Sequence, residues 1–336
     1  MSSPASPAKS KTPAPAASVA SAGRLTALCK AVADPLRLEV MRVLSNDSFG
    51  VQELARIFEM PQPGMSHHLK ILAKVELVHT RRQGNSIFYR RALLRGDDEL
   101  ASFLASLYAT IETLALTESV QTNIDKTHAE RAEQSRLFFA RNAAKFSEHQ
   151  AQLCELDQYL PNLRELLDVM ELAPSSRVLE VGPGAGDLLR ELAKRFDRVV
   201  ALDNSEEMLS ITRRSLSAAS RERVEFINAS LEDYSAGTQG IDAVVLNMVL
   251  HHMSSPRHAF QRVRDLLSEG GCLLVADLCS HDQEWVRESC GDVWLGFEPQ
   301  ELREWAQSAG FGEPKSMFLG LKNGFQIQIQ SFRAGI

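Results

Sequence analysis

The stretch RVLEVGPGAGDLLRELAKRFDRVVALD, residues 177–203, decides the fold of most of this 336-residue chain. Its first apolar run is followed by three closely spaced glycines, Gly182, Gly184 and Gly186. A helical pattern then leads to a second apolar run that ends in Asp203. Strand, glycine-rich turn, helix and strand in this order form a βαβ unit, whose turn lets the backbone approach a ligand closely. The stretch therefore predicts the ligand-binding edge of a parallel sheet.

The same alternation continues toward the C-terminus. The segments that follow are VEFINAS and IDAVVLN as strands, helices over 205–218 and 256–268, the strand GCLLVADL, the helix PQELREWAQSAG, and the strands KSMFLGL and FQIQIQSF. Strands separated by helical crossovers form a parallel sheet that helices cover on both faces. We expect an α/β doubly wound, Rossmann-like domain.

The position of Asp203 indicates that the ligand is a nucleotide-like molecule. An acid about twenty residues after the glycines is placed to bind both ribose hydroxyls. A dinucleotide cofactor fits this pattern as well as another adenosyl compound does, so these residues alone leave the ligand open.

The upstream segment 24–95 differs in both charge and pattern. It contains 12 Lys and Arg against 6 Asp and Glu, whereas the whole chain has a formal charge of −6. A basic segment on an acidic chain favours contact with a polyanion. Its apolar spacing predicts three short helices, a fourth helix after a tight break, and the strands VHTRR and IFYRR joined by residues 83–86. This order is typical of an α+β winged helix-turn-helix domain.

The fourth of these helices has an apolar face and an opposite polar face. Ser66, His67 and Lys70 lie on the polar face, and Gln62 lies at the helix start. In helix-turn-helix proteins this end of the second helix is nearest to the base edges. Gln can bond adenine in bidentate fashion, Ser and His can reach bases or phosphates, and Lys70 suits phosphate. We expect these residues to contact DNA, with a solvated helix face as the alternative.

Three arginines lie on the predicted hairpin, or wing, that follows. Arg81, Arg82 and Arg90 are suited to phosphates, which fix the position of a protein on DNA without specifying its sequence. We expect them to add affinity that depends on salt.

The runs AVADPLRLEVMRVL, VQELARIF, QPGMSHHLKIL and ELVHTRRQGNSIFYR resemble the winged-helix domain of the ArsR/SmtB family of bacterial repressors. The resemblance covers about residues 24–116 and implies a homodimer on palindromic, double-stranded operator DNA, released by an effector. Metal sensors of the family carry paired cysteines where this chain has Val51, Gln52 and Glu53. We therefore expect no metal site, and another ligand has to carry the signal.

The runs EVGPGAG, ALDNSEEML, LEDY and NMVLHHMSSP resemble class I methyltransferases that depend on S-adenosylmethionine (SAM), over about residues 131–336. The resemblance implies SAM or S-adenosylhomocysteine (SAH) as the ligand. The residues that it assigns to the ligand are Glu180 and the glycines Gly182, Gly184 and Gly186 at its amino-acid end, Asp203 at the ribose, Asn247 near the sulfur, and Ser230 and Leu231 near the adenine. Ser230 stands where the family commonly has an aspartate that contacts adenine.

His251 and His252 follow the fourth predicted strand, near the place of a methyl acceptor. One of them could act as a general base, because the pKa of histidine lies close to neutral pH. Packing and polar lining are the alternative role, so whether the chain is an enzyme stays open. The fusion resembles SAH-responsive repressors of the methionine cycle, which implies a regulator that senses SAM or SAH. An active methyltransferase of a small acceptor, with a regulatory winged helix, is the second hypothesis.

The remaining segments complete the predicted domain organisation. We expect a disordered tail over 1–22, a winged-helix and dimerisation domain over 23–116, a linker over 117–130, and the methyltransferase-like domain over 131–336. An amphipathic helix near 97–116 is expected to form the dimer contact. The five scattered cysteines and the lack of a long apolar run predict a cytoplasmic protein without a membrane anchor.

Overall fold

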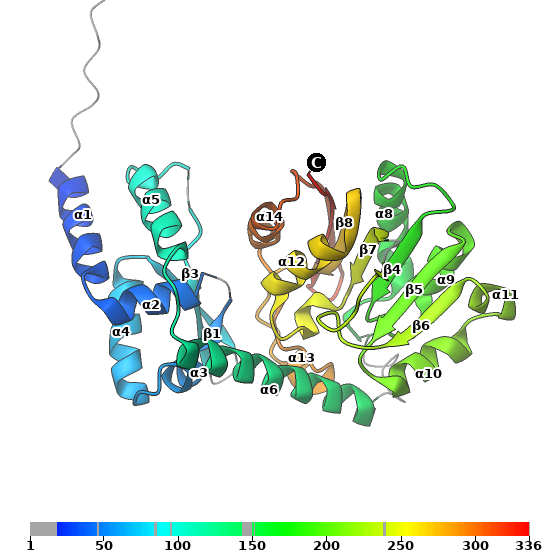
Figure 1. Ribbon diagram of the computed structural model, residues 1–336, viewed down its shortest axis with the longest axis horizontal. Coiled ribbons are helices and arrows are strands. Elements are labelled where there is room, and N and C mark those ends of the chain that lie inside the picture. The colour runs from blue at the N-terminus through cyan, green and yellow to red at the C-terminus, as the bar shows by residue number, and fades with distance from the viewer. Residues whose placement is uncertain are drawn as a thin grey trace, which may run out of the picture.

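The computed structural model describes residues 19–45, 47–83, 86–94, 96–142, 150, 152–237 and 240–335. A small domain of helices and one hairpin precedes a larger α/β domain, and one long helix, α6, runs along both of them (Figure 1). The expected tail lies outside the described residues up to position 18, and residues 19–22 begin the first helix. No helix in the described part of the chain is long and apolar enough to span a bilayer.

The first domain is a winged helix. Its elements are α1 (Val19–Val32), α2 (Pro35–Val43), β1 (Phe49–Gly50), α3 (Val51–Ile57), α4 (Gln62–Lys74), β2 (Val78–Gln83), β3 (Ser86–Arg91) and α5 (Ala101–Glu112). Helix α2 begins where Asp34 accepts a hydrogen bond from the Arg37 backbone N–H at 3.0 Å, with Pro35 in the first turn. The strands form an antiparallel sheet in the order β1-β3-β2. The predicted fold of this segment is confirmed.

The apolar stripe of α5 packs inside this domain. Leu104, Tyr108 and Ile111 are buried in the same core as Leu54 and Leu69. The sequence pattern left this helix without a partner in its own domain, and the structure supplies one, because the stripe faces the hydrophobic core of the domain. A dimer contact through α5 therefore has to use its other faces, and it stays a prediction.

Helix α6 (Glu118–Asn142) replaces the expected linker over 117–130. The segment contains neither Gly nor Pro, and it buries Val120, Ile124, Thr127 and Arg131 at helical spacing. The sequence pattern did not predict this buried stripe, because the segment is rich in polar residues and the stripe itself includes a threonine and an arginine. A continuous helix therefore leads from the first domain toward the second over these residues.

The second domain is a doubly wound α/β sheet. Its elements are α8 (Leu156–Val169), β4 (Arg177–Val181), α9 (Asp187–Arg195), β5 (Arg198–Asp203), α10 (Glu206–Ser215), α11 (Ala218–Arg221), β6 (Val224–Asn228), β7 (Ile241–Asn247), η3 (Leu250–His252), α12 (Pro256–Leu266), β8 (Leu267–Leu278), α13 (Trp285–Ser289), α14 (Pro299–Ser308), β9 (Lys315–Gly320) and β10 (Gln326–Arg333). The strand order is β6-β5-β4-β7-β8-β10-β9, and β10 is antiparallel to both of its neighbours. The predicted α/β class is confirmed, and the terminal hairpin distinguishes this sheet from an all-parallel dinucleotide-binding sheet.

A hydrophobic core lies on each face of this sheet, as expected for strands that are buried on both sides. The carboxyl ends of the parallel strands β4, β5 and β7 meet at one edge of the sheet, and the chain order reverses between β4 and β7. This is the position where open α/β sheets bind their ligands.

Candidate functional site

The glycine turn after β4 forms a narrow backbone cradle. Gly182, Gly184 and Gly186 have φ angles of 64°, 55° and 85°, in the left-handed region that favours glycine. A Cβ atom at Gly182 would lie 2.4 Å from the Cγ2 atom of Val249. Gly186 is the N-cap of α9, whose first turn therefore points toward the cradle. The turn requires glycine at these places for both conformational and steric reasons.

A pocket opens directly above this cradle. Five of the residues predicted to hold the ligand line it: Gly182, Gly184, Asp203, Ser230 and Leu231. The pocket is also lined by Asn204, Met208, Ala229, Glu232, Met248, Val249, His252, Met253 and Ser254, and by Ala132, Ser135 and Phe139 of α6. The structure thus brings the ends of β4, β5, β6 and β7 together around one cavity.

Asp203 lies at the end of β5, facing this pocket. Burial raises the pKa of its carboxyl to about 6, while N–H donation from Ser205 and Asn204 opposes the shift. The Ser205 N–H donates to the Asp203 carboxylate at 2.9 Å, which fixes the orientation of the acid. The remaining carboxylate capacity can accept hydroxyl groups of a ligand.

Glu180 is the most deeply buried acid at the cradle, with 1% of its surface exposed. Its Oε2 atom has no hydrogen-bond partner among the described residues. Burial raises the pKa of this carboxyl to about 8. Leaving a buried acceptor unsatisfied is costly. The group is therefore suited to a donor or a positive charge brought by a ligand.

The other predicted ligand residues lie at the rim or behind it. The Oδ1 atom of Asn247 accepts a hydrogen bond from the Tyr159 hydroxyl at 3.0 Å, which holds the amide at the end of β7. Ser230 donates to Asp233 at 2.7 Å and so begins the loop that carries Leu231 into the pocket. Glu180, Gly186 and Asn247 support the cradle without lining the pocket.

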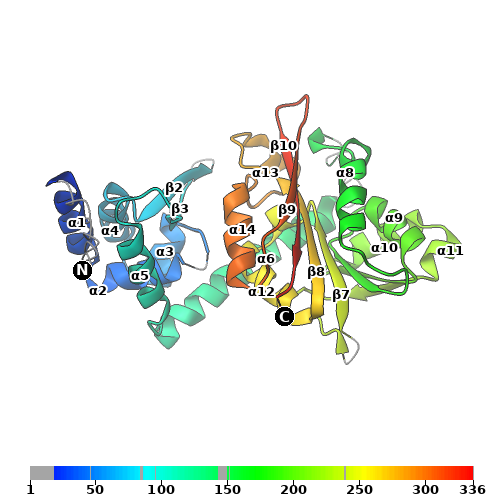
Figure 2. The ribbon, with the colours of Figure 1, turned by 90° about the horizontal axis from the view of Figure 1, so that it is seen from above.

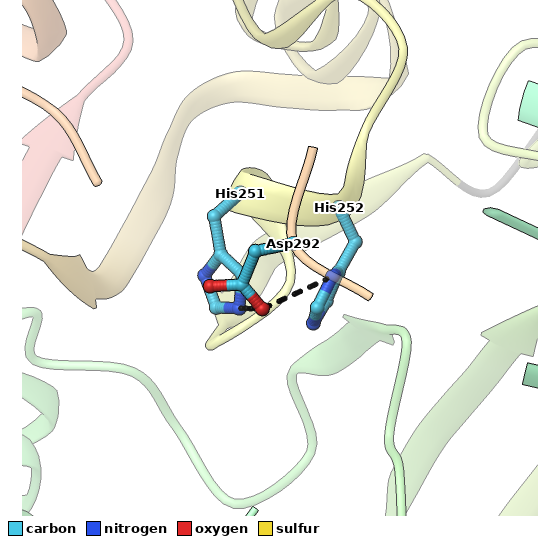
Figure 3. A group of neighbouring side chains, drawn as sticks. All are labelled: His251, His252 and Asp292. Carbon is cyan, nitrogen blue, oxygen red and sulfur yellow. Dashed lines mark ion pairs between the residues drawn. The ribbon is translucent and has the colours of Figure 1, made fainter. Parts of the chain in front are cut away.

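His251 and His252 form part of a buried polar cluster that Figure 3 shows together with Asp292. The Nδ1 atom of His251 lies 2.7 Å from the Asp277 carboxylate. Burial lowers the pKa of His251, but the carboxylates of Asp277 and Asp292 outweigh this effect and raise it to about 9. Burial together with the adjacent His251 lowers the pKa of His252 well below its usual value.

Helix α6 connects this pocket to the first domain. Ala132, Ser135 and Phe139 on its C-terminal half line the pocket, and its N-terminal half packs on α3. No sequence signal pointed to Ala132 as a pocket residue, because it adjoins the stretch predicted as a linker. One helix therefore contributes to both domains.

Arg131, in the middle of α6, is the central contact between the domains. Its guanidinium donates to both carboxylate oxygens of Glu53, at 2.9 and 2.6 Å, and to the Ser254 carbonyl at 3.1 Å. Its Cζ atom lies 5.0 Å from the ring centroids of Phe49 and Trp294. Glu53 belongs to α3 and Ser254 lines the pocket, so one buried side chain touches both sites.

The predicted DNA-reading face of α4 is accessible. Gln62, His67 and Lys70 are exposed and Ser66 is half-buried, whereas the apolar residues Met65, Leu69 and Leu72 are buried in the core. The structure thus places these four polar residues on the outer side of the helix. Their contact with DNA stays a prediction.

The wing lies against the second domain. The Arg81 guanidinium donates to the carbonyls of Leu295 and Gly296, and Arg90 forms an ion pair with Glu301 of α14. Figure 2 shows the β2–β3 hairpin directed toward α13 and α14. In this arrangement Arg81 and Arg90 are half-buried, and their contact with phosphate stays a prediction.

The reason lies in the surface that the second domain offers to the wing. Phe88 of β3 packs edge-on against Trp294, with ring centroids 5.7 Å apart, and a buried carboxylate and two backbone carbonyls accept the arginines. Arg82 remains exposed. Phosphate contacts by Arg81 and Arg90 would require this interface to open.

Comparisons with known proteins agree with both domains. The family model "Methyltransferase domain" matches residues 178–271, and "Bacterial regulatory protein, arsR family" matches residues 34–80. The chain is 32% identical over 134 residues to an "uncharacterized methyltransferase" of Mycobacterium tuberculosis. The matched stretch covers 38% of this chain and 66% of that relative. It thus spans slightly less than two thirds of the length of this relative.

A "biofilm growth-associated repressor" of Agrobacterium fabrum is 37% identical over 82 residues, covering 24% of this chain and 67% of the repressor. Among solved structures, the putative methyltransferase in a complex with the Trm112 methyltransferase activator of Haloferax volcanii is similar at 17% identity. The match covers 59% of this chain and 98% of that one, with a TM-score of 0.49.

The fold and the two sites define a helix-turn-helix domain fused to a class I methyltransferase domain. The chain belongs to the bacterial regulatory proteins of the arsR family through its first domain, and its second domain belongs to the class I methyltransferase fold.

Proposed function

We propose that this protein is a transcriptional regulator that binds operator DNA as a homodimer and responds to SAM or SAH. In this proposal α4 enters the major groove, with Gln62 and Ser66 toward the bases and His67 and Lys70 toward bases and phosphates. The adenosyl ligand occupies the pocket above the glycine cradle. The arsR-family domain and the exposed polar face of α4 support the first half of the proposal.

The residues present at the cradle fit an S-adenosyl compound. The unsatisfied Oε2 atom of Glu180 can meet the ammonium group of the amino-acid end, and Asp203 can accept the ribose hydroxyls. The space that a Cβ atom at Gly182 would fill lets the backbone approach the ligand. In this proposal Ser230 and Leu231, which line the pocket, contact the adenine, and Asn247 is the residue near the sulfur. When bound, the ligand supplies a charged sulfonium as SAM or a neutral sulfur as SAH.

The observation that carries the regulatory proposal is the double contact of Arg131. A ligand that moves Ser254 or the C-terminal half of α6 acts on Arg131, which holds Glu53 of α3. Helix α3 packs directly against the DNA-reading helix α4. Contacts between neighbouring elements therefore run from the pocket rim through Arg131 and α3 to the DNA-reading helix, and a network of this kind supports coupling between the two sites.

The docked wing defines two states of the regulator. With the wing held by Leu295, Gly296 and Glu301, Arg81 and Arg90 are unavailable to DNA; with the wing released, they can reach phosphate together with Arg82. A ligand shifts such an equilibrium only by its difference in affinity for the two states. A complete swing from 1:99 to 99:1 requires about 5.5 kcal/mol of that difference.

The decisive experiment measures the affinity of the full chain for DNA taken from upstream of its own gene. The same DNA is titrated with the protein alone, with the protein and SAM, and with the protein and SAH. We expect one adenosyl compound to change the operator affinity more than the other. Asp203→Ala should bind DNA normally and lose the ligand effect, while Asp265→Ala, at an exposed position on α12 away from the pocket, should retain it. An operator affinity that neither compound changes, although calorimetry shows that they bind, would refute the sensor role.

A second candidate function is methyl transfer to a small acceptor. It is favoured by the Asp277–His251 pair, because the Nε2 atom of His251 has no hydrogen-bond partner among the described residues. His251 and His252 line a small pocket of about 20 Å³ together with Phe139 and Met248, next to the adenosyl pocket. The purified protein would be given labelled SAM and a cell extract as the source of acceptors. Methyl transfer that is lost in His251→Ala would support this function, and no transfer by the wild type would argue against it.

A further inference from the structure

A cluster of three side chains brings two imidazoles and one carboxylate together at the end of β7. His251 and His252 belong to η3, and Asp292 lies in the loop between α13 and α14. One Asp292 oxygen lies 3.9 Å from the His251 Nε2 atom and 3.9 Å from the His252 Nδ1 atom. One donor atom from each residue lies within 4.8 Å of the others (Figure 3).

Two of these three side chains are buried and carry polar atoms without a hydrogen-bond partner in the described part of the chain, whereas the His252 Nδ1 atom donates to the Gly291 carbonyl at 3.2 Å. His251 is 1% exposed and Asp292 is 3% exposed. The His251 Nε2 atom and both carboxylate oxygens of Asp292 have no hydrogen-bond partner among the described residues. Unsatisfied buried polar atoms are rare in folded proteins, because each of them costs free energy. Unsatisfied atoms on two neighbouring buried side chains, with a second imidazole beside them, indicate room for a bound species that meets them.

We propose that His251, His252 and Asp292 bind a divalent transition-metal ion, for which Zn²⁺ is the probe. Two imidazole nitrogens and one carboxylate oxygen make a three-ligand set that leaves a coordination position open. Bonds of about 2.0–2.1 Å place the ligand atoms of a tetrahedral site about 3.3 Å apart. The Asp292–histidine spacings of 3.9 Å have to contract by well under 1 Å, and a pair of donor atoms at the 4.8 Å limit by about 1.5 Å, which side-chain rotations achieve. The His252 Nδ1 atom exchanges its bond to the Gly291 carbonyl for the ion.

The surroundings of His251 have the second layer that metal sites need. Its Nδ1 atom is held by the Asp277 carboxylate at 2.7 Å, so that Nε2 points toward Asp292. The second oxygen of Asp277 accepts the Leu250 N–H at 3.0 Å, which fixes the carboxylate itself. A metal-bound histidine usually donates its other ring N–H to a carboxylate in this way. Asp277 is therefore a positioning residue for the ion.

The site lies between the adenosyl pocket and the wing. His252 lines the pocket, and the His251 carbonyl accepts the backbone N–H groups of Val293 and Trp294, each at 3.0 Å. Trp294 packs on Phe88 of the wing. An ion that ties Asp292 to η3 would therefore hold the loop that grips the wing, with its open position toward the pocket. The metal proposal itself stands on the ligand geometry and not on the regulatory function.

The test uses the full chain, stripped with a chelator and then titrated with Zn²⁺ by calorimetry, with the metal content measured after dialysis. The background variant Cys29→Ser removes an exposed thiol. We expect one Zn²⁺ per chain, and Co²⁺ in its place should give the absorption of nitrogen and oxygen ligands without thiolate bands. The readout involves no DNA and no adenosyl ligand, so its failure is distinct from failure of the proposed function.

The variants decide where the ion binds. Asp292→Asn and His252→Gln should each lose stoichiometric binding, and Asp277→Asn should weaken it by about 10–100-fold. His258→Gln, an exposed histidine on α12, is the matched control and should bind as the parent does. Circular dichroism checks the fold of each variant, and either ligand variant suffices if the other does not fold. No Zn²⁺ bound by the parent chain, or equal affinity in the ligand variants, would overturn the proposal.

Discussion

The adenosyl pocket and the DNA-reading face of α4 use ionisable side chains in opposite ways. At the pocket, Glu180 and Asp203 are buried, and burial raises the pKa values of their carboxyls to about 8 and about 6. On α4, the basic residue Lys70 is exposed to water. The pocket groups therefore lower the stability of the ligand-free fold, whereas the DNA face has little influence on it. Substitutions should affect stability in the first region and salt-dependent binding in the second.

The largest effect is expected at Arg131, which lies between the two regions. Arg131→Met removes the partner of Glu53 and leaves a carboxylate unpaired in the interface. Removing one partner of a buried ion pair typically costs about 3–5 kcal/mol. We expect the free energy of unfolding in urea to fall by this amount. Arg136→Met, on the same helix but in an exposed pair with Glu133, should leave it almost unchanged. Equal effects of the two variants would remove Arg131 from its central role.

Glu180→Gln tests the cost of the buried pocket acid through pH. The folded-state pKa of about 8 lies above the ordinary value of 4.5, so the fold keeps a proton that the unfolded chain releases. Stability from this group is therefore fully present below pH 4.5 and declines until about pH 8. Between pH 5 and pH 7.5 the wild type should lose about 3 kcal/mol relative to Glu180→Gln, at about 1.4 kcal/mol per pH unit.

The measurement is urea unfolding of the ligand-free protein at both pH values. Glu165→Gln, at an exposed position on α8, should follow the wild type. The same Glu180→Gln variant should bind the adenosyl ligand more weakly, because it lacks the carboxylate charge. If its unfolding curve runs parallel to that of the wild type with pH, Glu180 is not the acid that limits stability.

The wing lies between these extremes, because it is basic like α4 but partly buried like the pocket. Glu301→Gln removes the charge that holds Arg90 and keeps an oxygen for the Glu298 N–H, which Glu301 accepts at 2.8 Å. We expect the wing to be released more easily and operator affinity to rise about tenfold, equivalent to about 1.4 kcal/mol. Gel shifts at fixed salt would measure this. Glu313→Gln, in an exposed pair with Arg303, serves as the control. A weaker or unchanged affinity would mean that wing docking does not oppose DNA binding.

The sequence was a good guide wherever a pattern acts within one element or one sheet. The glycines after β4, Asp203 at the end of β5 and the polar face of α4 all lie where their spacing predicted, because helical and strand periodicity fix which side a residue faces. The five predicted residues that line the pocket come from neighbouring strand ends, which the doubly wound topology brings together.

Contacts between the domains could not be predicted in this way. Arg81 and Arg90 have the spacing of phosphate-binding residues, and nothing local shows that Leu295 and Glu301 lie opposite them, more than two hundred residues away. Arg131, the first residue after the predicted linker, carried no signal of a contact between the domains, because burial of an arginine becomes visible only when its carboxylate and aromatic partners are known. Asp292 was missed for the same reason, since it joins His251 only through the tertiary fold.

The smallest change in stability is expected on α4, where it sharpens the contrast with the pocket. Lys70→Ala should alter the free energy of unfolding by less than about 0.5 kcal/mol, because the side chain is exposed. If Lys70 neutralises a phosphate, the slope of log affinity against log salt should flatten by about 0.9. Lys126→Ala, exposed on α6, is the control for general loss of charge. A loss of stability without a change in slope would place Lys70 in the fold instead of at the DNA, and the difference between the two regions would then no longer follow burial.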